Sequence, residues 1–244
     1  ENAKRVSCVP YDVVYESEVR EYIAGNPLSF LRVTRPEADF PLDQHPSPSE
    51  IFARGRQNLD QFIADRILAT DAEEALYVYQ LASETHSQTG VVACCSIDEY
   101  EAGSIKKHEH VRPDKVGERT GHLLAVGAQT GLIFLAFRGT AEIHRLIDET
   151  VTADPLYEFE CPAGVRQRIW RVPEIDTWVD AFAEVPSLYI ADGHHRAESA
   201  MLARAELRRQ DPGHTGKEDY NYVVAGLFPA EDLRILPYNR VVKD

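Results

Sequence analysis

Two adjacent histidines stand between an aspartate and an arginine in the stretch YIADGHHRAESA, residues 189–200. The apolar run before the aspartate is typical of a strand, and the segment after the arginine has helical spacing, so Asp192 and Gly193 form a strand-to-helix joint. The first N–H groups of a helix lack partners within the helix and carry the positive end of its dipole, which makes the joint a natural anion site. Gly193 also lets the backbone approach a ligand closely.

Three side chains at this joint have the chemistry to hold an anion. Arg196 has a fixed positive fork suited to phosphate, and His194 or His195 adds a donor whose charge changes near neutral pH. A metal bound by the adjacent histidines is disfavoured, because successive residues of a helix point about 100° apart. A structural alternative stays open, in which Asp192 caps the helix and the histidines hydrogen-bond neighbouring loops.

A second polar cluster is IKKHEHVRPDKVGER, residues 105–119, which holds five basic side chains and two histidines around a helix that starts at a proline. Alone, such a cluster is typical of a solvated charged loop. The whole chain, however, has 26 Lys and Arg against 40 Asp and Glu, a net charge of −14. In so acidic a protein, two concentrations of basic groups indicate a shared anionic ligand, and we expect both to line one cleft.

Composition excludes several classes of protein. The net charge repels a phosphate backbone and disfavours a broad nucleic-acid-binding face. No apolar run approaches the roughly 18 residues that span a bilayer, and the first residues lack the apolar centre of a signal peptide, so we expect a cytoplasmic protein with no membrane partner. The four cysteines form no C-x-x-C motif and are interpreted as structural; they are Cys8, Cys94, Cys95 and Cys161.

Patterning predicts an α+β fold, because strands and helices alternate without a strict βαβ rhythm. A serine cap at Ser47 or Ser49 predicts a long helix over 50–68, and two apolar runs joined by a polar stretch predict a β-hairpin. The expected strands are 28–33, 75–83 and 89–97 (the hairpin), 131–137, two near 159–161 and 166–172, and 187–191. The other expected helices are 16–24, 114–127, 141–150, 174–183 and 197–209.

Six motifs in order along the chain make it resemble a known family, the domain of unknown function 1015, over its whole length. They are PYDVV (10–14), GNPLSFLRVTRPE (25–37), HSQTG (86–90), IKKHEHVRPDK (105–115), YIADGHHR (189–196) and ILPYNRVVKD (235–244). The chain departs from the family pattern at Val111, where threonine is common, and at Gly117-Glu118, which replace a doubly acidic step. Members are usually longer at both ends, so we expect a further C-terminal region.

The D-G-H-H-R motif resembles in turn the ParB/sulfiredoxin-like superfamily, whose loop at a helix start binds nucleotide phosphates and which includes free-serine kinases. The resemblance implies a mixed-sheet ParB/sulfiredoxin-like core over 105–244 and an N-terminal α+β portion with the hairpin over 1–104. Sulfiredoxin chemistry needs a cysteine in the loop, and here both positions are histidine. We therefore do not expect that activity.

The resemblance implies a small-molecule kinase that phosphorylates free L-serine, or a similar hydroxyl metabolite, with ATP or ADP and Mg²⁺. Phosphoryl transfer needs cations on the phosphates, a carboxylate at the attacking hydroxyl and a metal. Glu109 is the expected base, assisted by His108 or Lys107, and Asp192 is the expected magnesium ligand. The expected phosphate-binding residues are Gly193, His194, His195, Arg196, Lys107 and Arg112.

Two alternatives stay open. One is a non-enzymatic nucleotide switch or transcriptional regulator, since ParB binds CTP with its related loop; the chain shows no helix-turn-helix motif and carries the wrong charge for DNA. The other is anion binding without turnover, because Val111 and Glu118 alter the site. In each case we expect a nucleotide or small molecule as partner and no nucleic acid, and we leave a homo-oligomer open.

Overall fold

A single mixed sheet of eight strands organises the protein, which is described here by a computed structural model for residues 2–161, 164–235 and 242. Its strand order is β3-β7-β4-β8-β2-β1-β6-β5. The strands are β1 Leu76–Ala82, β2 Ser87–Ser96, β3 Ile105–Lys106, β4 Ile133–Phe137, β5 Tyr157–Glu160, β6 Arg166–Val172, β7 Leu188–Asp192 and β8 Tyr222–Pro229. Only the pairs β3–β7 and β4–β8 are parallel within the described part of the chain. The α+β class expected from the sequence is confirmed.

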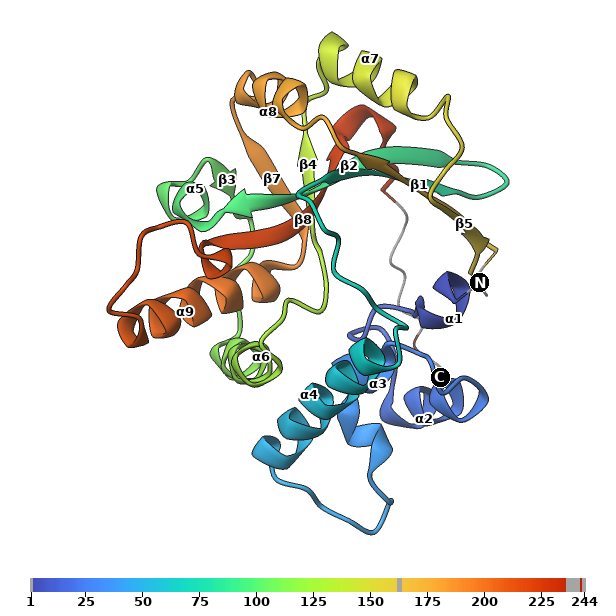
Figure 1. Ribbon diagram of the computed structural model, residues 1–244, viewed down its shortest axis with the longest axis vertical. Helices are drawn as coiled ribbons and strands as arrows, with labels where there is room; N and C mark the ends of the chain where they lie inside the picture. Colours follow the sequence, from blue (N-terminus) through green and yellow to red (C-terminus); the bar gives the residue numbers. More distant parts are fainter. Residues whose placement is uncertain (1, 162–163, 236–241, 243–244) are drawn as a thin grey trace.

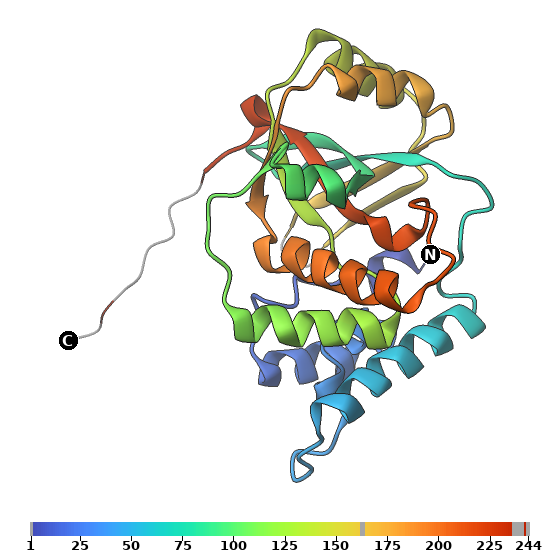
Figure 2. The same ribbon diagram turned by 90° about the vertical axis from the view of Figure 1, so that its left-hand side faces the viewer.

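Helices cover both faces of the sheet (Figures 1 and 2). Helices α7 and α8 lie on one face, and α9, α6 and α4 follow one another in layers below the other face (Figure 2). The helices are α1 Ala3–Val6, α2 Glu16–Gly25, α3 Leu31–Thr34, α4 Pro48–Ala64, α5 Ile97–Ala102, α6 Pro113–Val126, α7 Ala141–Thr150, α8 Asp176–Ala183 and α9 His194–Gln210. Short 3-10 helices are η1 Pro36–Asp39, η2 Asp219–Asn221 and η3 Ala230–Asp232.

Several local predictions are confirmed. Strands β1 and β2 pair antiparallel as the expected hairpin. The N–H of Glu50 donates to the hydroxyl of Ser47, so Ser47 rather than Ser49 caps α4. Strand β7 leads through Gly193 directly into α9, as the strand-to-helix joint requires. Of the adjacent cysteines, which are both free thiols, Cys95 is buried as expected, whereas Cys94 is exposed.

The strand expected at 28–33 is wrong. This segment turns into α3, and Leu31 and Val33 are both fully buried although they stand two residues apart, because the short helix is enclosed by other helices of the N-terminal region. A short run with alternating buried residues has the pattern of a strand, and only tertiary packing identifies it as a helical turn. Helix α5, strand β3 and the central strand β8 were not predicted from the sequence pattern.

The sheet crosses the boundary proposed at residues 104 and 105. The hairpin strands β1 and β2 pair with β6 and β8, so both sides of that boundary build one continuous sheet. The division into 1–104 and 105–244 stays a prediction. Most of the motif at 235–244 lies outside the described residues. Among the described residues, no helix combines the length and apolar composition needed to cross a membrane.

Candidate functional site

Gly193 forms the sharp joint between β7 and α9. Its φ is +94°, in the left-handed region that favours glycine. A Cβ at this position would lie 3.1 Å from both Nε and Nη2 of Arg196 and 3.1 Å from the Cα of Ile133. Glycine is therefore needed for the backbone angle and for the space into which Arg196 folds back. The cap residue of α9 is Gly193 itself, which has no side chain that could accept from the N–H groups that begin the helix.

Arg196 is held by two carboxylates from different parts of the chain. Its Nη1 lies 3.0 Å from Oδ2 of Asp12, and its Nη2 pairs with Asp192. The side chain is 17% exposed, and its Nε is buried with no partner among the described residues. Burial lowers the pKa of Arg196, but Tyr11 and the two carboxylates raise it more. Asp192 therefore neutralises Arg196 rather than capping the helix.

The two histidines bind the loop that carries the second cluster. The backbone N–H of Arg112 donates to Nε2 of His195 over 3.1 Å, and that of His108 points at Nε2 of His194 over 3.5 Å. Since Nε2 of His194 accepts, the proton of the neutral ring is on Nδ1, which lies 3.6 Å from Oε2 of Glu109. Burial lowers the pKa of His194, which favours this neutral form. The histidine contacts match the structural alternative, and they bring both polar clusters together.

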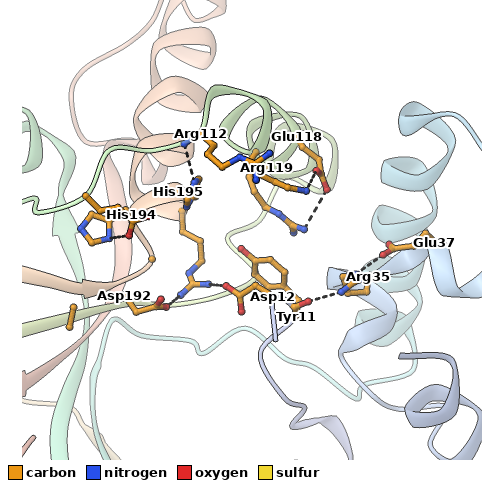
Figure 3. A pocket seen from close by; sticks show the side chains of 15 residues that line it. Tyr11, Asp12, Arg35, Glu37, Arg112, Glu118, Arg119, Asp192, His194 and His195 are labelled. Carbon is orange, nitrogen blue, oxygen red and sulfur yellow. Dashed lines mark hydrogen bonds and ion pairs between the residues drawn. The ribbon is translucent and has the colours of Figure 1, made fainter. Parts of the chain in front are cut away.

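Both clusters line one pocket of about 480 Å³ (Figure 3), a size typical of small-molecule sites. Basic and acidic side chains occur there in equal number. The basic ones are Arg35, Arg112, Lys115, Arg119 and Arg196, and the acidic ones are Asp12, Glu37, Glu109, Glu118 and Asp192. The start of α9 opens into this pocket, so an anion that enters it meets unpaired N–H groups as well as basic side chains.

Two residues expected in the site lie outside the pocket lining. Lys107 Nζ lies 3.3 Å from Oε2 of Glu198 and 3.9 Å from the ring centroid of Tyr100, so its charge is already engaged. His108 packs its ring against that of His194, with centroids 4.4 Å apart. Val111, the departure from the family pattern, is not among the pocket residues either, whereas Glu118 is.

Four pocket residues that precede the sheet in the chain were not expected from the sequence. Tyr11 and Asp12 come from the PYDVV motif, and the ring of Tyr11 lies 3.9 Å from the guanidinium of Arg119. Arg35 and Glu37 come from η1 and the residue before it. The signal was present, because both segments belong to motifs that carry the family resemblance. Because they are far along the chain from residues 105–119 and 189–200, the sequence did not indicate that they share a pocket with those residues.

The side chains that the structure describes do not form a metal site by themselves. Within residues 2–161, 164–235 and 242, no three His, Cys, Asp or Glu side chains form a group that could hold a metal ion. Asp12 and Asp192 nevertheless face the pocket with hard oxygen donors. Such a pair suits Mg²⁺ that keeps several waters and takes its remaining ligands from a phosphate.

The fold and pocket define an α+β protein in which the joint between a strand and a helix, at Gly193, lines a pocket of charged side chains. The chain belongs to the family described as protein of unknown function (DUF1015), whose model matches residues 1–244. No curated protein matches the chain, and no solved structure does.

Proposed function

We propose that this protein is a cytoplasmic small-molecule kinase that phosphorylates free L-serine, or a similar hydroxyl metabolite, with ATP or ADP. The observation that carries the proposal is the uncapped start of α9, which opens beside Arg196 into a pocket that also contains the Glu109 carboxylate. The β7–α9 joint supports a ParB/sulfiredoxin-like core within residues 105–244.

The phosphates of the nucleotide would bind at the start of α9. The N–H groups of Gly193 and of the first residues of α9 would donate to them, and Arg112 and Lys115 would add charge from the facing loop and helix. Arg112 and Lys115 currently pair with Asp114 and Glu118 through exposed contacts, and surface pairs of this kind are weak enough to exchange partners.

The balanced charge of the pocket favours a nucleotide that arrives with Mg²⁺. Basic and acidic side chains cancel, so the negative charge of a polyphosphate needs a further cation. Asp192 and Asp12 are the residues that would hold the ion. When bound, Mg²⁺ neutralises charge on the transferring phosphoryl group.

Glu109 is the proposed base. The hydroxyl oxygen of the acceptor forms a bond to the terminal phosphorus, the bond from that phosphorus to the leaving phosphate oxygen breaks, and the hydroxyl proton moves to the Glu109 carboxylate. His194 Nδ1, 3.6 Å from Glu109 Oε2, limits the positions that this carboxylate can take. The products are a phosphate monoester and the shortened nucleotide.

A nucleotide-binding switch is the second candidate, and the pairing of Arg196 with Asp12 favours it. A phosphate that took over Arg196 would free the Asp12 carboxylate, while Arg35 still holds the carbonyl oxygens of Tyr11 and Val14. The result is a local change of conformation rather than a reaction. Calorimetric titration of the protein with ATP, ADP and CTP, each with Mg²⁺, separates the candidates. The kinase predicts binding of an adenine nucleotide, and a clear preference for CTP would favour the switch.

A further inference from the structure

One end of the pocket is formed by a pair of oppositely charged side chains. Neither of them is among the proposed phosphate-binding residues. Arg35 precedes η1 and Glu37 lies within it, and Arg35 Nε lies 2.5 Å from Glu37 Oε1. Both side chains line the pocket although they are largely buried, with 17% and 25% of their surface exposed. A charged pair at this depth is costly to desolvate unless its remaining polar atoms find partners.

The backbone holds Arg35 in a fixed orientation. Its Nη1 donates to the carbonyl oxygens of Tyr11 and Val14 over 2.7 and 2.9 Å. The described hydrogen bonds of Arg35 use Nε and Nη1, and that of the Glu37 side chain uses Oε1, so Nη2 of Arg35 and Oε2 of Glu37 have no partner among the described residues. The pair therefore leaves one cationic donor and one anionic acceptor side by side.

We infer that Arg35 and Glu37 bind the carboxylate and the ammonium of a free α-amino acid, an inference that rests on the proposed function for the existence of an acceptor. Arg35 Nη2 donates to the carboxylate, and the ammonium donates to Glu37 Oε2. A ligand with a carboxylate alone would meet the charge of Glu37, and one with an ammonium alone would meet that of Arg35. A zwitterion satisfies both, and it leaves the charge balance of the pocket unchanged.

The position of the pair fits an acceptor site. Arg35 and Glu37 lie on one side of Tyr11, and Asp192 and His194 lie on the other (Figure 3). An amino acid bound by its charged groups at the first end directs its side chain toward the end where α9 begins. A hydroxyl on that side chain then faces the phosphates.

A ligand series on the wild-type protein tests the inference without a mutation. Calorimetry is run with L-serine, with ethanolamine, which lacks the carboxylate, and with 3-hydroxypropionate, which lacks the ammonium, in the presence and absence of Mg²⁺ and ADP. We expect L-serine to bind about ten-fold or more tighter than either analogue, because each analogue leaves one charged group of the pair unsatisfied. Equal affinities for the three ligands would overturn the inference.

The variant Glu37→Gln tests whether Glu37 is the group that binds the ammonium of the amino acid. It keeps the size of the side chain and should weaken L-serine binding about ten-fold, whereas 3-hydroxypropionate, which has no ammonium and no longer meets the charge of Glu37, should bind at least as tightly as it does to the wild-type protein. Glu142→Gln, an exposed member of another Arg–Glu pair on α7, is the matched control. Equal losses for both ligands, or no loss, would contradict a role for Glu37 in ammonium binding.

The outcomes separate the inference from the proposed function. Nucleotide binding and turnover of another hydroxyl compound, without amino acid binding, would overturn the inference and leave the kinase standing. Amino acid binding that depends on Glu37, without phosphorylated product, would leave the amino acid site standing and overturn the kinase.

Discussion

Arg196 and Asp12 are separated by 184 residues in the chain, yet Nη1 of the arginine lies 3.0 Å from Oδ2 of the aspartate. This contact joins the N-terminal PYDVV segment to the start of α9. It also means that the arginine that we propose as a phosphate ligand is already neutralised by two carboxylates of the protein. The arginine and its two carboxylates therefore form the part of the site that a ligand must rearrange.

Replacing Arg196 tests its role at the phosphates. Arg196→Ala should weaken nucleotide binding by roughly 1.5 to 3 kcal/mol, the range for loss of a charge-assisted hydrogen bond. Calorimetric titration with Mg²⁺ and ATP or ADP measures the loss. Arg145→Ala on α7, which removes another arginine with two carboxylate partners, is the matched control. Equal affinities of Arg196→Ala and wild type would remove Arg196 from the site.

Gly193→Ala should both destabilise the protein and damage the site. The Cβ would meet the guanidinium of Arg196 and the Cα of Ile133 in addition to straining a φ of +94°, so we expect a loss of about 2–4 kcal/mol in the free energy of unfolding. Gly103→Ala is the control, because Gly103 has a φ of +82° with nothing within 4 Å of the added Cβ. Urea denaturation compares them. Similar losses in both variants would show that the contact with Arg196 is unimportant.

Substitutions of two lysines in the polar cluster at residues 105–119 should change nucleotide affinity to different extents. Lys115 lines the pocket, whereas Lys107 is engaged by Glu198 and Tyr100 outside it. Lys115→Met should weaken nucleotide binding about three- to ten-fold, and Lys107→Met should change it less than about two-fold. The same titration measures both. The reverse order would favour the role in phosphate binding that the sequence alone suggested for Lys107.

Stability should fall below neutral pH because of buried histidines. His122 is 5% exposed and its ring nitrogen lies 2.9 Å from the carbonyl oxygen of Val33, and burial lowers its pKa, as it does that of His194. The unfolded chain therefore binds more protons, and the contribution present above about pH 6.5 is lost as the pH falls toward the folded pKa. His122→Gln should reduce the loss of stability between about pH 7.5 and 5, measured by urea denaturation, whereas replacement of the exposed His45 should not.

The elements that depend on residues close together in the chain could be predicted from the sequence. The joint at Gly193, a serine cap at Ser47 or Ser49 and the hairpin each depend on neighbouring residues, and the sequence predicted all of them; the structure places the cap at Ser47. Strand β8 is buried on both faces between β4 and β2, so it lacks the alternation that marks a half-exposed strand. Arg35 and Asp12 reach the pocket only through tertiary packing, which spacing along the chain does not encode.

The most direct test of the kinase is product formation. The protein with L-serine, Mg²⁺ and ATP or ADP should form O-phosphoserine, detected by mass spectrometry or phosphorus NMR, with L-threonine and L-homoserine as competing acceptors. Glu109→Gln should lower turnover by about 10²- to 10⁴-fold while it spares nucleotide affinity, because the carboxylate acts at the hydroxyl and not at the phosphates. Glu142→Gln should retain full activity. Nucleotide binding without phosphorylation of any hydroxyl compound would contradict the kinase and make the nucleotide switch the leading account.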